Sequence, residues 1–255
     1  MKNLVIARQT GGGQTGFLSA KGFTGSVGLS GFTLAEVLIT LGIIGVVAAM
    51  TLPVLIHKLN DRANVSGMKK AYSILSQATL SVAAENPIDS WNMQTADIEG
   101  TKDVFELYKP YFKVVKDCGC GKRALGCWSP SATKALNGKT YFYGHPNGIG
   151  DTYCAARLAD GINISFDTWT ASSLGVKESN EDDTDVYFFY VDVNGDKSPN
   201  TLGLDVFQFV VKKGKHGVIP AGLANNSSMC SKDDTTSYAG IDCAAKVLYE
   251  DKISY

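Results

Sequence analysis

The sequence predicts an α+β protein in which a long N-terminal helix packs on an antiparallel β-sheet. Two patterns support this fold class. An apolar run from Phe32 to Ile56 continues into an amphipathic segment, and both are typical of helix. Beyond residue 87, short segments rich in aromatic and β-branched residues alternate with Gly, Asn and Asp, as in antiparallel strands. The chain is therefore divided into residues 1–31, a helix at 32–86 and a globular α+β head at 87–255.

The first 31 residues differ from the rest of the chain. They carry Lys2, Arg8 and Lys21 without any acidic residue, and they are rich in glycine. Such a composition cannot bury a core. This stretch is therefore interpreted as a leader peptide or a disordered arm.

The apolar run FTLAEVLITLGIIGVVAAMTLPVLI contains one charged residue, Glu36. About 20 apolar residues are enough to span a bilayer as a helix, so residues 32–56 are predicted to be the transmembrane half of the helix. A carboxylate within such a segment costs roughly 2.5–3.5 kcal/mol on insertion scales. Glu36 is therefore a candidate functional residue that needs a partner.

An ordinary secretory signal does not fit this region. Its apolar core would be about 7–15 residues long and would end in small residues at the cleavage site. Here the run is longer, and no A-x-A-like sequence follows it. Cleavage before the run, at the Gly31–Phe32 bond, would leave the helix attached to the mature protein.

The sequence GFTLAE at residues 31–36, followed by an unbroken apolar helix, resembles the class III signal of type IV pilins and of the related pseudopilins of type II secretion. The resemblance covers about residues 31–85 and implies a pilin-like fold. It also implies that a prepilin peptidase cleaves at Gly31–Phe32 and N-methylates Phe32. Pro53 matches the proline that kinks the family's helix. An incomplete second copy at residues 21–24 lacks a following apolar run, which disfavours cleavage there.

Cleavage would give Phe32 a positively charged α-amine, about one helical turn before Glu36. The amine and the carboxylate can pair within one helix or between staggered helices of neighbouring subunits. A buried charge is tolerated when paired and strongly unfavourable when unpaired. Glu36 is therefore expected to set the register of assembly, as the resemblance also implies.

The helix is expected to extend well beyond the apolar run. Pro53 removes a backbone donor, which predicts a kink or local melting, although a tolerated membrane-helix proline explains it equally well. Asn86-Pro87 is expected to end the helix. Apolar and small residues recur at spacings of three and four along one face: Val65, Met68, Tyr72, Leu75, Thr79 and Val82.

In the head, residues 104–115 are predicted to form a short amphipathic helix that Pro110 interrupts. Asp160-Gly161 is a strong signal for a hairpin turn. Successive strands joined by turns favour an antiparallel sheet, which packs most simply on the long helix. The predicted strands are residues 140–143, 153–158, 162–166, 186–193 and 206–211.

The cysteines all lie in the head: Cys118, Cys120, Cys127, Cys154, Cys230 and Cys243. A domain outside the cytoplasm favours disulfides, but the sequence does not choose among the many possible connectivities. Cys230–Cys243 is the first expected pair, because it would close a C-terminal loop like that of many pilins. The alternative is a zinc site built from the first four cysteines, although their spacing is not usual for zinc.

The segment VDVNGDKSPNTLGLDVF places oxygen ligands at Asp192, Asn194, Asp196 and Asp205. It loosely resembles the start of a calcium loop and, in position, the calcium-binding loop of major pseudopilins. The EF-hand pattern is incomplete, because its glycine is misplaced and no glutamate closes it. A strand–turn–strand connection on Asn194-Gly195 explains the same residues. Calcium is therefore an optional ligand, and no cofactor is required.

The sequence does not predict an enzyme. His57, His145 and His216 lie in unrelated contexts, and no nucleophile elbow, P-loop or HExxH motif is present. Because the net charge is −1, the overall charge predicts binding neither to nucleic acid nor to an anionic membrane surface. The acidic cluster at residues 178–185 is interpreted as a solvated loop.

Taken with the resemblance, the sequence predicts a structural subunit of a type IV pilus-like filament or of a type II secretion pseudopilus, and a minor adhesive subunit also remains open. The precursor is expected in the inner membrane as a single-pass protein with its head outside the cytoplasm, and later in a periplasmic pseudopilus or a surface filament. Expected partners are the prepilin peptidase, other pilin subunits and the inner-membrane assembly platform. The alternative is a single-pass membrane-anchored protein with a ligand-binding or adhesive ectodomain.

Overall fold

The structure is a computed structural model that describes residues 31–91, 98–121, 126–146, 148–149, 154–170, 185–212, 217–223 and 229–255. The chain divides into two compact units, residues 1–50 and 51–255. The boundary falls within the long N-terminal helix α1 (Leu34–Glu85).

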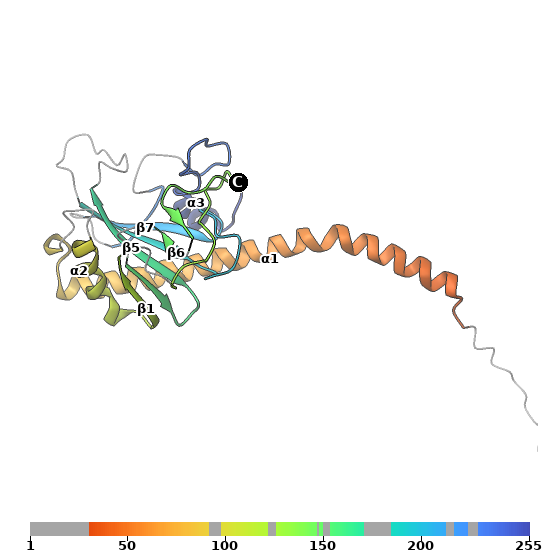
Figure 1. Ribbon diagram of the computed structural model, residues 1–255, viewed down its shortest axis with the longest axis horizontal. Coiled ribbons are helices and arrows are strands. Elements are labelled where there is room, and N and C mark those ends of the chain that lie inside the picture. Colours follow the sequence, from red (N-terminus) through yellow and green to blue (C-terminus); the bar gives the residue numbers. More distant parts are fainter. Residues whose placement is uncertain are drawn as a thin grey trace, which may run out of the picture. The chain divides into compact units, whose positions relative to one another are not determined.

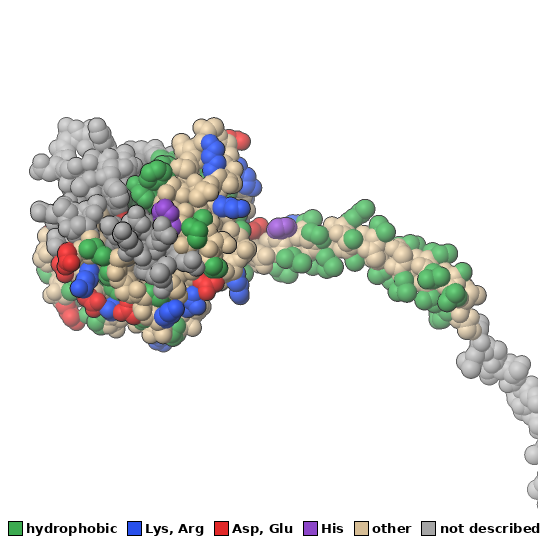
Figure 2. Space-filling model, in the orientation of Figure 1, with side chains coloured by type: hydrophobic (Ala, Val, Ile, Leu, Met, Phe, Trp, Pro, Cys, Tyr) green, Lys and Arg blue, Asp and Glu red, His purple; other side chains and the backbone are tan. Residues whose placement is uncertain are grey.

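Helix α1 (Leu34–Glu85) is 52 residues long and includes the whole apolar run from its third residue onward. By length and composition it is the one described helix that is able to cross a membrane. The large apolar side chains of residues 34–59 are exposed, and Figure 2 shows such side chains along the visible face of the helix. The helix continues without interruption through Pro53, so the predicted local melting at this proline does not occur.

In the second unit, the amphipathic half of α1 packs on the head. Its buried residues form the predicted stripe, and Tyr72, which is half-buried, stacks on Phe209 with 5.8 Å between ring centroids. The helix ends at Glu85, directly before Asn86-Pro87, as predicted. The buried positions are Asn64, Val65, Met68, Ala71, Leu75, Ala78, Thr79 and Val82.

The main sheet has the strand order β1-β4-β5-β6-β7-β8 among the described residues, and every neighbouring pair is antiparallel (Figure 1). The predicted hairpin turn at Asp160-Gly161 joins β4 to β5, and Gly161 has the left-handed φ of +79° that favours glycine. The strands are β1 (Val114–Cys120), β4 (Cys154–Leu158), β5 (Asn163–Thr170), β6 (Asp185–Asp192), β7 (Val206–Lys212) and β8 (Ile219–Pro220).

The predicted strand at residues 140–143 is wrong, and the predicted helix at residues 104–115 is confirmed only up to Tyr108. Residues 140–143 form a turn next to a small ladder of β2 (Gly144–His145) and β3 (Gly148–Ile149), because Tyr141 is buried in an aromatic cluster and its carbonyl accepts from the Gly144 amide. The predicted helix at 104–115 is instead α2 (Ile98–Tyr108), a 3-10 turn η2 (Lys109–Tyr111) that contains Pro110, and the start of β1. Proline cannot continue the helical hydrogen bonding, so the chain extends after it.

Strand β6 carries a core on both of its faces, which explains its continuous apolar sequence. Tyr187, Phe189 and Val191 join the main core, to which α1, α2 and α3 (Cys243–Glu250) contribute. Phe188 and Tyr190 join a second, aromatic core on the other face with Trp128 and Tyr141. Helix α1 is also tied to α2 by a buried 2.7 Å hydrogen bond between the hydroxyls of Thr79 and Tyr108.

The six cysteines form three disulfides: Cys118–Cys127, Cys120–Cys154 and Cys230–Cys243. The last is the pair that was expected first. Cys120–Cys154 joins β1 to β4 at positions that face one another in the ladder. The four cysteines considered for zinc are thus paired with one another as two disulfides.

Candidate functional site

The N-terminal end of α1 is built around Thr33 and Glu36. The Thr33 backbone N–H and hydroxyl both donate to Glu36 Oε2, at 2.8 Å each, and the Glu36 N–H donates to Thr33 Oγ1 at 3.2 Å. This reciprocal arrangement is a capping box, in which a threonine before the helix and a glutamate in its first turn satisfy otherwise free backbone donors. Glu36 therefore has a partner within its own helix.

A role for Glu36 is predicted from the sequence, whereas the role of Thr33 was not predicted. The signal was present, since Thr-x-x-Glu before an apolar run is the pattern of a capping box. The capping box fixes the first turn of α1 directly after Phe32. It thereby holds the Glu36 carboxylate close to the site at which the new α-amine is expected.

The predicted cleavage site is sterically open within the described residues. The Phe32 side chain is 88% exposed. A side chain added at Gly31 would meet no atom within 4 Å. The Gly31–Phe32 bond precedes the start of α1 at Leu34. Residues 1–30 of the predicted leader lie outside the described residues.

A second candidate site lies in the turn between β6 and β7. Asp205 is fully buried there. Its carboxylate accepts from the backbone N–H groups of Asn200 and Thr201, at 2.7 and 2.6 Å, and from Asn194 Nδ2 at 2.8 Å. Burial raises the pKa of Asp205, and the backbone donors of Thr201 and Asn200 oppose this shift. Asp205 thus organises the turn around a buried carboxylate.

Asp192 lies in the same turn and is less well satisfied. Its Oδ1 accepts from the Asn194 N–H at 3.2 Å, while its buried Oδ2 has no hydrogen-bond partner among the described residues. Burial raises the pKa of Asp192 well above its ordinary value, and the nearby charge of Asp205 raises it further. The side-chain oxygens of Asn194 and Asn200 are also buried without a described partner.

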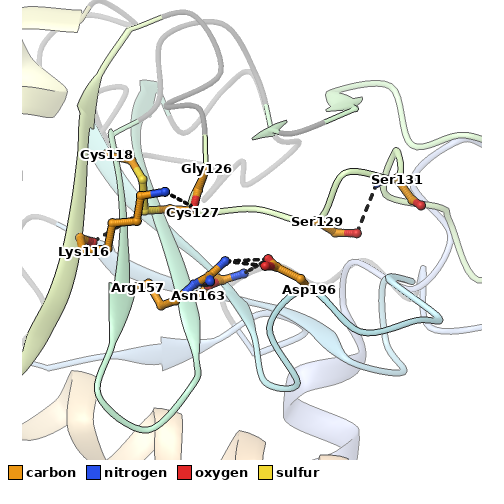
Figure 3. A network of polar contacts seen from close by, with 9 residues as sticks. All are labelled: Lys116, Cys118, Gly126, Cys127, Ser129, Ser131, Arg157, Asn163 and Asp196. Carbon is orange, nitrogen blue, oxygen red and sulfur yellow. Dashed lines mark hydrogen bonds and ion pairs between the residues drawn. A yellow bond between two sulfur atoms is a disulfide. The ribbon is translucent and has the colours of Figure 1, made fainter.

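Asp196 does not join this group, because its carboxylate binds Arg157 and Asn163. Both of its carboxylate oxygens accept from Arg157 Nη2, at 2.7 and 2.6 Å, and Oδ1 also accepts from Asn163 Nδ2 at 3.1 Å (Figure 3). This network fastens the turn to strands β4 and β5. Of the predicted calcium ligands, the structure therefore brings together Asp192, Asn194 and Asp205, and it adds Asn200.

The chemistry of this turn fits calcium in part. Calcium takes about 6–8 oxygen ligands, and amide and backbone oxygens are acceptable to it. Unpaired buried oxygens on Asp192, Asn194 and Asn200 are of the right kind. No group of three or more His, Cys, Asp or Glu that could hold a metal occurs among the described residues. An ion in this turn would therefore depend on Asp192 together with Asn side chains and backbone carbonyls.

Added calcium is expected to raise the melting temperature of the full chain if it binds this turn, because a ligand that binds only the folded state stabilises it. Asp192→Ala should abolish the increase. Asp196→Ala is the matched control, since it removes a carboxylate from the same turn but not from the candidate ligand set. Differential scanning fluorimetry with calcium and with chelator measures both. An equal increase in wild type and Asp192→Ala would contradict calcium binding here.

Comparison of the chain with protein-family models, curated proteins and solved structures finds no match.

The histidines do not form a group among the described residues. His57 is exposed on α1, His145 is half-buried in β2, and His216 lies outside the described residues. The acidic cluster at 178–185 also lies outside them, apart from the backbone of Asp185.

Proposed function

We propose that the chain is a structural subunit of a type IV pilin-like filament, processed at Gly31–Phe32 and assembled through α1. The observation that supports the proposal is that the GFTLAE sequence at residues 31–36 coincides with the start of α1. An open Gly31–Phe32 bond is followed by a capped helix whose large apolar side chains are exposed and whose sole charge before Lys58 is Glu36.

The exposed apolar surface of residues 34–59 supports an assembly role. Side chains such as Leu38, Ile44 and Leu55 are more than half exposed, and a surface of this kind requires cover by lipid or by another protein. Lipid would cover it in the precursor, and the helices of neighbouring subunits would replace lipid in a filament. Glu36 would then meet the Phe32 amine of a neighbour, which removes the cost of a buried, unpaired charge.

Processing at Gly31–Phe32 and assembly through α1 would each require a partner. A prepilin peptidase would cleave and N-methylate the chain, and an inner-membrane platform would insert it among other pilin subunits. The head would lie outside the cytoplasm, where its three disulfides are favoured. Both a surface pilus and a periplasmic pseudopilus agree with these features. The alternative is a membrane-anchored protein with a binding ectodomain, which differs from a pilin in keeping its N-terminus unprocessed.

Mass spectrometry of the mature N-terminus tests the proposal. Protein isolated from its native membrane is expected to begin at N-methylated Phe32. Gly31→Asp is expected to leave the precursor uncleaved, because the peptidase must accept a side chain where none was present. A mature protein that begins at Met1 would contradict processing and favour a simple membrane anchor. Electron microscopy with labelled protein would then distinguish a surface pilus from a periplasmic pseudopilus.

A further inference from the structure

A basic groove lies where the second half of α1 meets the C-terminal segment, within the unit of residues 51–255. Its volume is about 730 Å³. Charged side chains dominate its lining: Lys58, Asp61, Arg62, Lys69, Asp251 and Lys252. The apolar side chains that end the membrane-length run, such as Leu55 and Leu59, are exposed beside it along the same helix.

Three basic residues of α1 lie on one face of the helix. Lys58, Arg62, Val65 and Lys69 succeed one another at spacings of four, three and four residues, so Lys58, Arg62 and Lys69 line the same face. Lys69 is neutralised by an ion pair with Asp251, at 2.5 Å between Nζ and Oδ1. Lys58, Arg62 and Lys252 have no ion-pair partner in the described part of the chain, and Asp61 opposes them with one negative charge. The groove therefore keeps an excess of positive charge.

Along the axis of a membrane-spanning α1, Lys58 and Arg62 would lie at the level of the lipid headgroups. At 1.5 Å per residue, Lys58 and Arg62 lie about 3 and 9 Å beyond Ile56, the last residue of the apolar run. The polar region of a bilayer adds about 5–8 Å on each side of its hydrocarbon core. A helix that spans the membrane over residues 34–56 would therefore place these two cations at or just above the phosphates of the lipid.

We propose that this groove binds the phosphate of an anionic phospholipid in the leaflet nearest the head, through Lys58, Arg62 and Lys252. The guanidinium of Arg62 is suited to paired hydrogen bonds with phosphate oxygens, and the two ammonium groups add point charges. The acyl chains would continue along the exposed apolar side chains of α1. The inference rests on the proposal that α1 spans a membrane, but it does not require filament assembly.

Binding can be measured by native mass spectrometry of the full chain in neutral detergent, titrated with short-chain phosphatidylglycerol, short-chain phosphatidylcholine or inorganic phosphate. Wild type is expected to bind phosphatidylglycerol at least about tenfold more tightly than either of the others. The triple variant that combines Lys58→Gln, Arg62→Gln and Lys252→Gln should weaken phosphatidylglycerol binding by about tenfold or more. Each basic residue near an anionic surface increases the binding affinity several-fold.

The matched control is Lys102→Gln, Lys134→Gln, Lys232→Gln, which removes the same charge from exposed positions outside the groove. Its affinity should stay within about twofold of wild type. Equal losses in the two triple variants, equal binding of the two lipids, or equal binding of inorganic phosphate would each overturn the proposal. Resistance of the protein to carbonate extraction from membranes tests anchoring separately, and the N-terminal mass tests processing, so a failure of one proposal is distinguishable from a failure of another.

Discussion

Glu36→Ala is expected to leave cleavage at Gly31–Phe32 intact and to reduce filament yield by at least about tenfold. The carboxylate is the one charge in the apolar run, and a buried α-amine that loses its partner carries a cost of about 3–5 kcal/mol. Immunoblotting for the processed subunit and quantification of sheared filaments measure the two effects. Normal filament yield from this variant would contradict the assembly role.

The capping box supplies sharper controls for this experiment. Glu36→Gln keeps a side chain that can complete the capping box but removes the charge, so it should fail to assemble as Glu36→Ala does. Thr33→Ala removes the cap, at a cost of about 1 kcal/mol to the helix, but keeps the charge, so it should assemble. The opposite pattern, with Glu36→Gln active and Thr33→Ala inactive, would assign Glu36 a structural role in starting α1.

Asp205→Ala is expected to lower the free energy of unfolding by about 3 kcal/mol. The substitution leaves the buried N–H groups of Asn200 and Thr201 without their acceptor, and an unsatisfied buried donor costs about 1–3 kcal/mol. The relief of a buried carboxylate, whose pKa burial raises, offsets part of this loss. Chemical unfolding of the full chain in chelator, followed by circular dichroism, measures the change.

Asp196→Ala is the control for this second prediction. Asp196 also lies in the turn and also accepts several hydrogen bonds, but its side chain is 44% exposed. Exposed ion pairs contribute about 0–1 kcal/mol, so the variant should lose no more than that. Similar losses in the two variants would mean that the turn is held by its connection to Arg157 and not by the buried carboxylate of Asp205.

Several elements could be predicted because their determinants are local. The end of α1 at Glu85 follows from Asn86-Pro87, and the hairpin between β4 and β5 follows from Asp160-Gly161. The buried face of α1 follows from its spacing alone. Strands β4 to β7 combine aromatic and β-branched residues in short runs, which distinguishes them from helix even though β6 is buried on both faces.

Other features depend on contacts between residues far apart in the chain. Asp196 looked like a calcium ligand by its position, but Arg157, 39 residues earlier, binds it. Val114 and Val115 looked helical by spacing, but they continue into a strand that pairs with β4. Asn200 lies in the left-handed region, with φ of +52°, and is held there by contacts that include donation from its side-chain amide to the Ser131 carbonyl, 69 residues earlier.

Gly67 lies where helix α1 approaches the turn between β6 and β7. A Cβ atom at this position would lie 3.0 Å from Val193 Cβ, so the absence of a side chain lets α1 approach the residue that directly follows Asp192. The Val193 N–H in turn donates to the Asp205 backbone carbonyl at 2.9 Å. The helix through which subunits are proposed to associate is thus in van der Waals contact with the carboxylate-containing turn. A residue with a side chain at position 67 would therefore have to displace Val193, and with it the end of the turn, from α1.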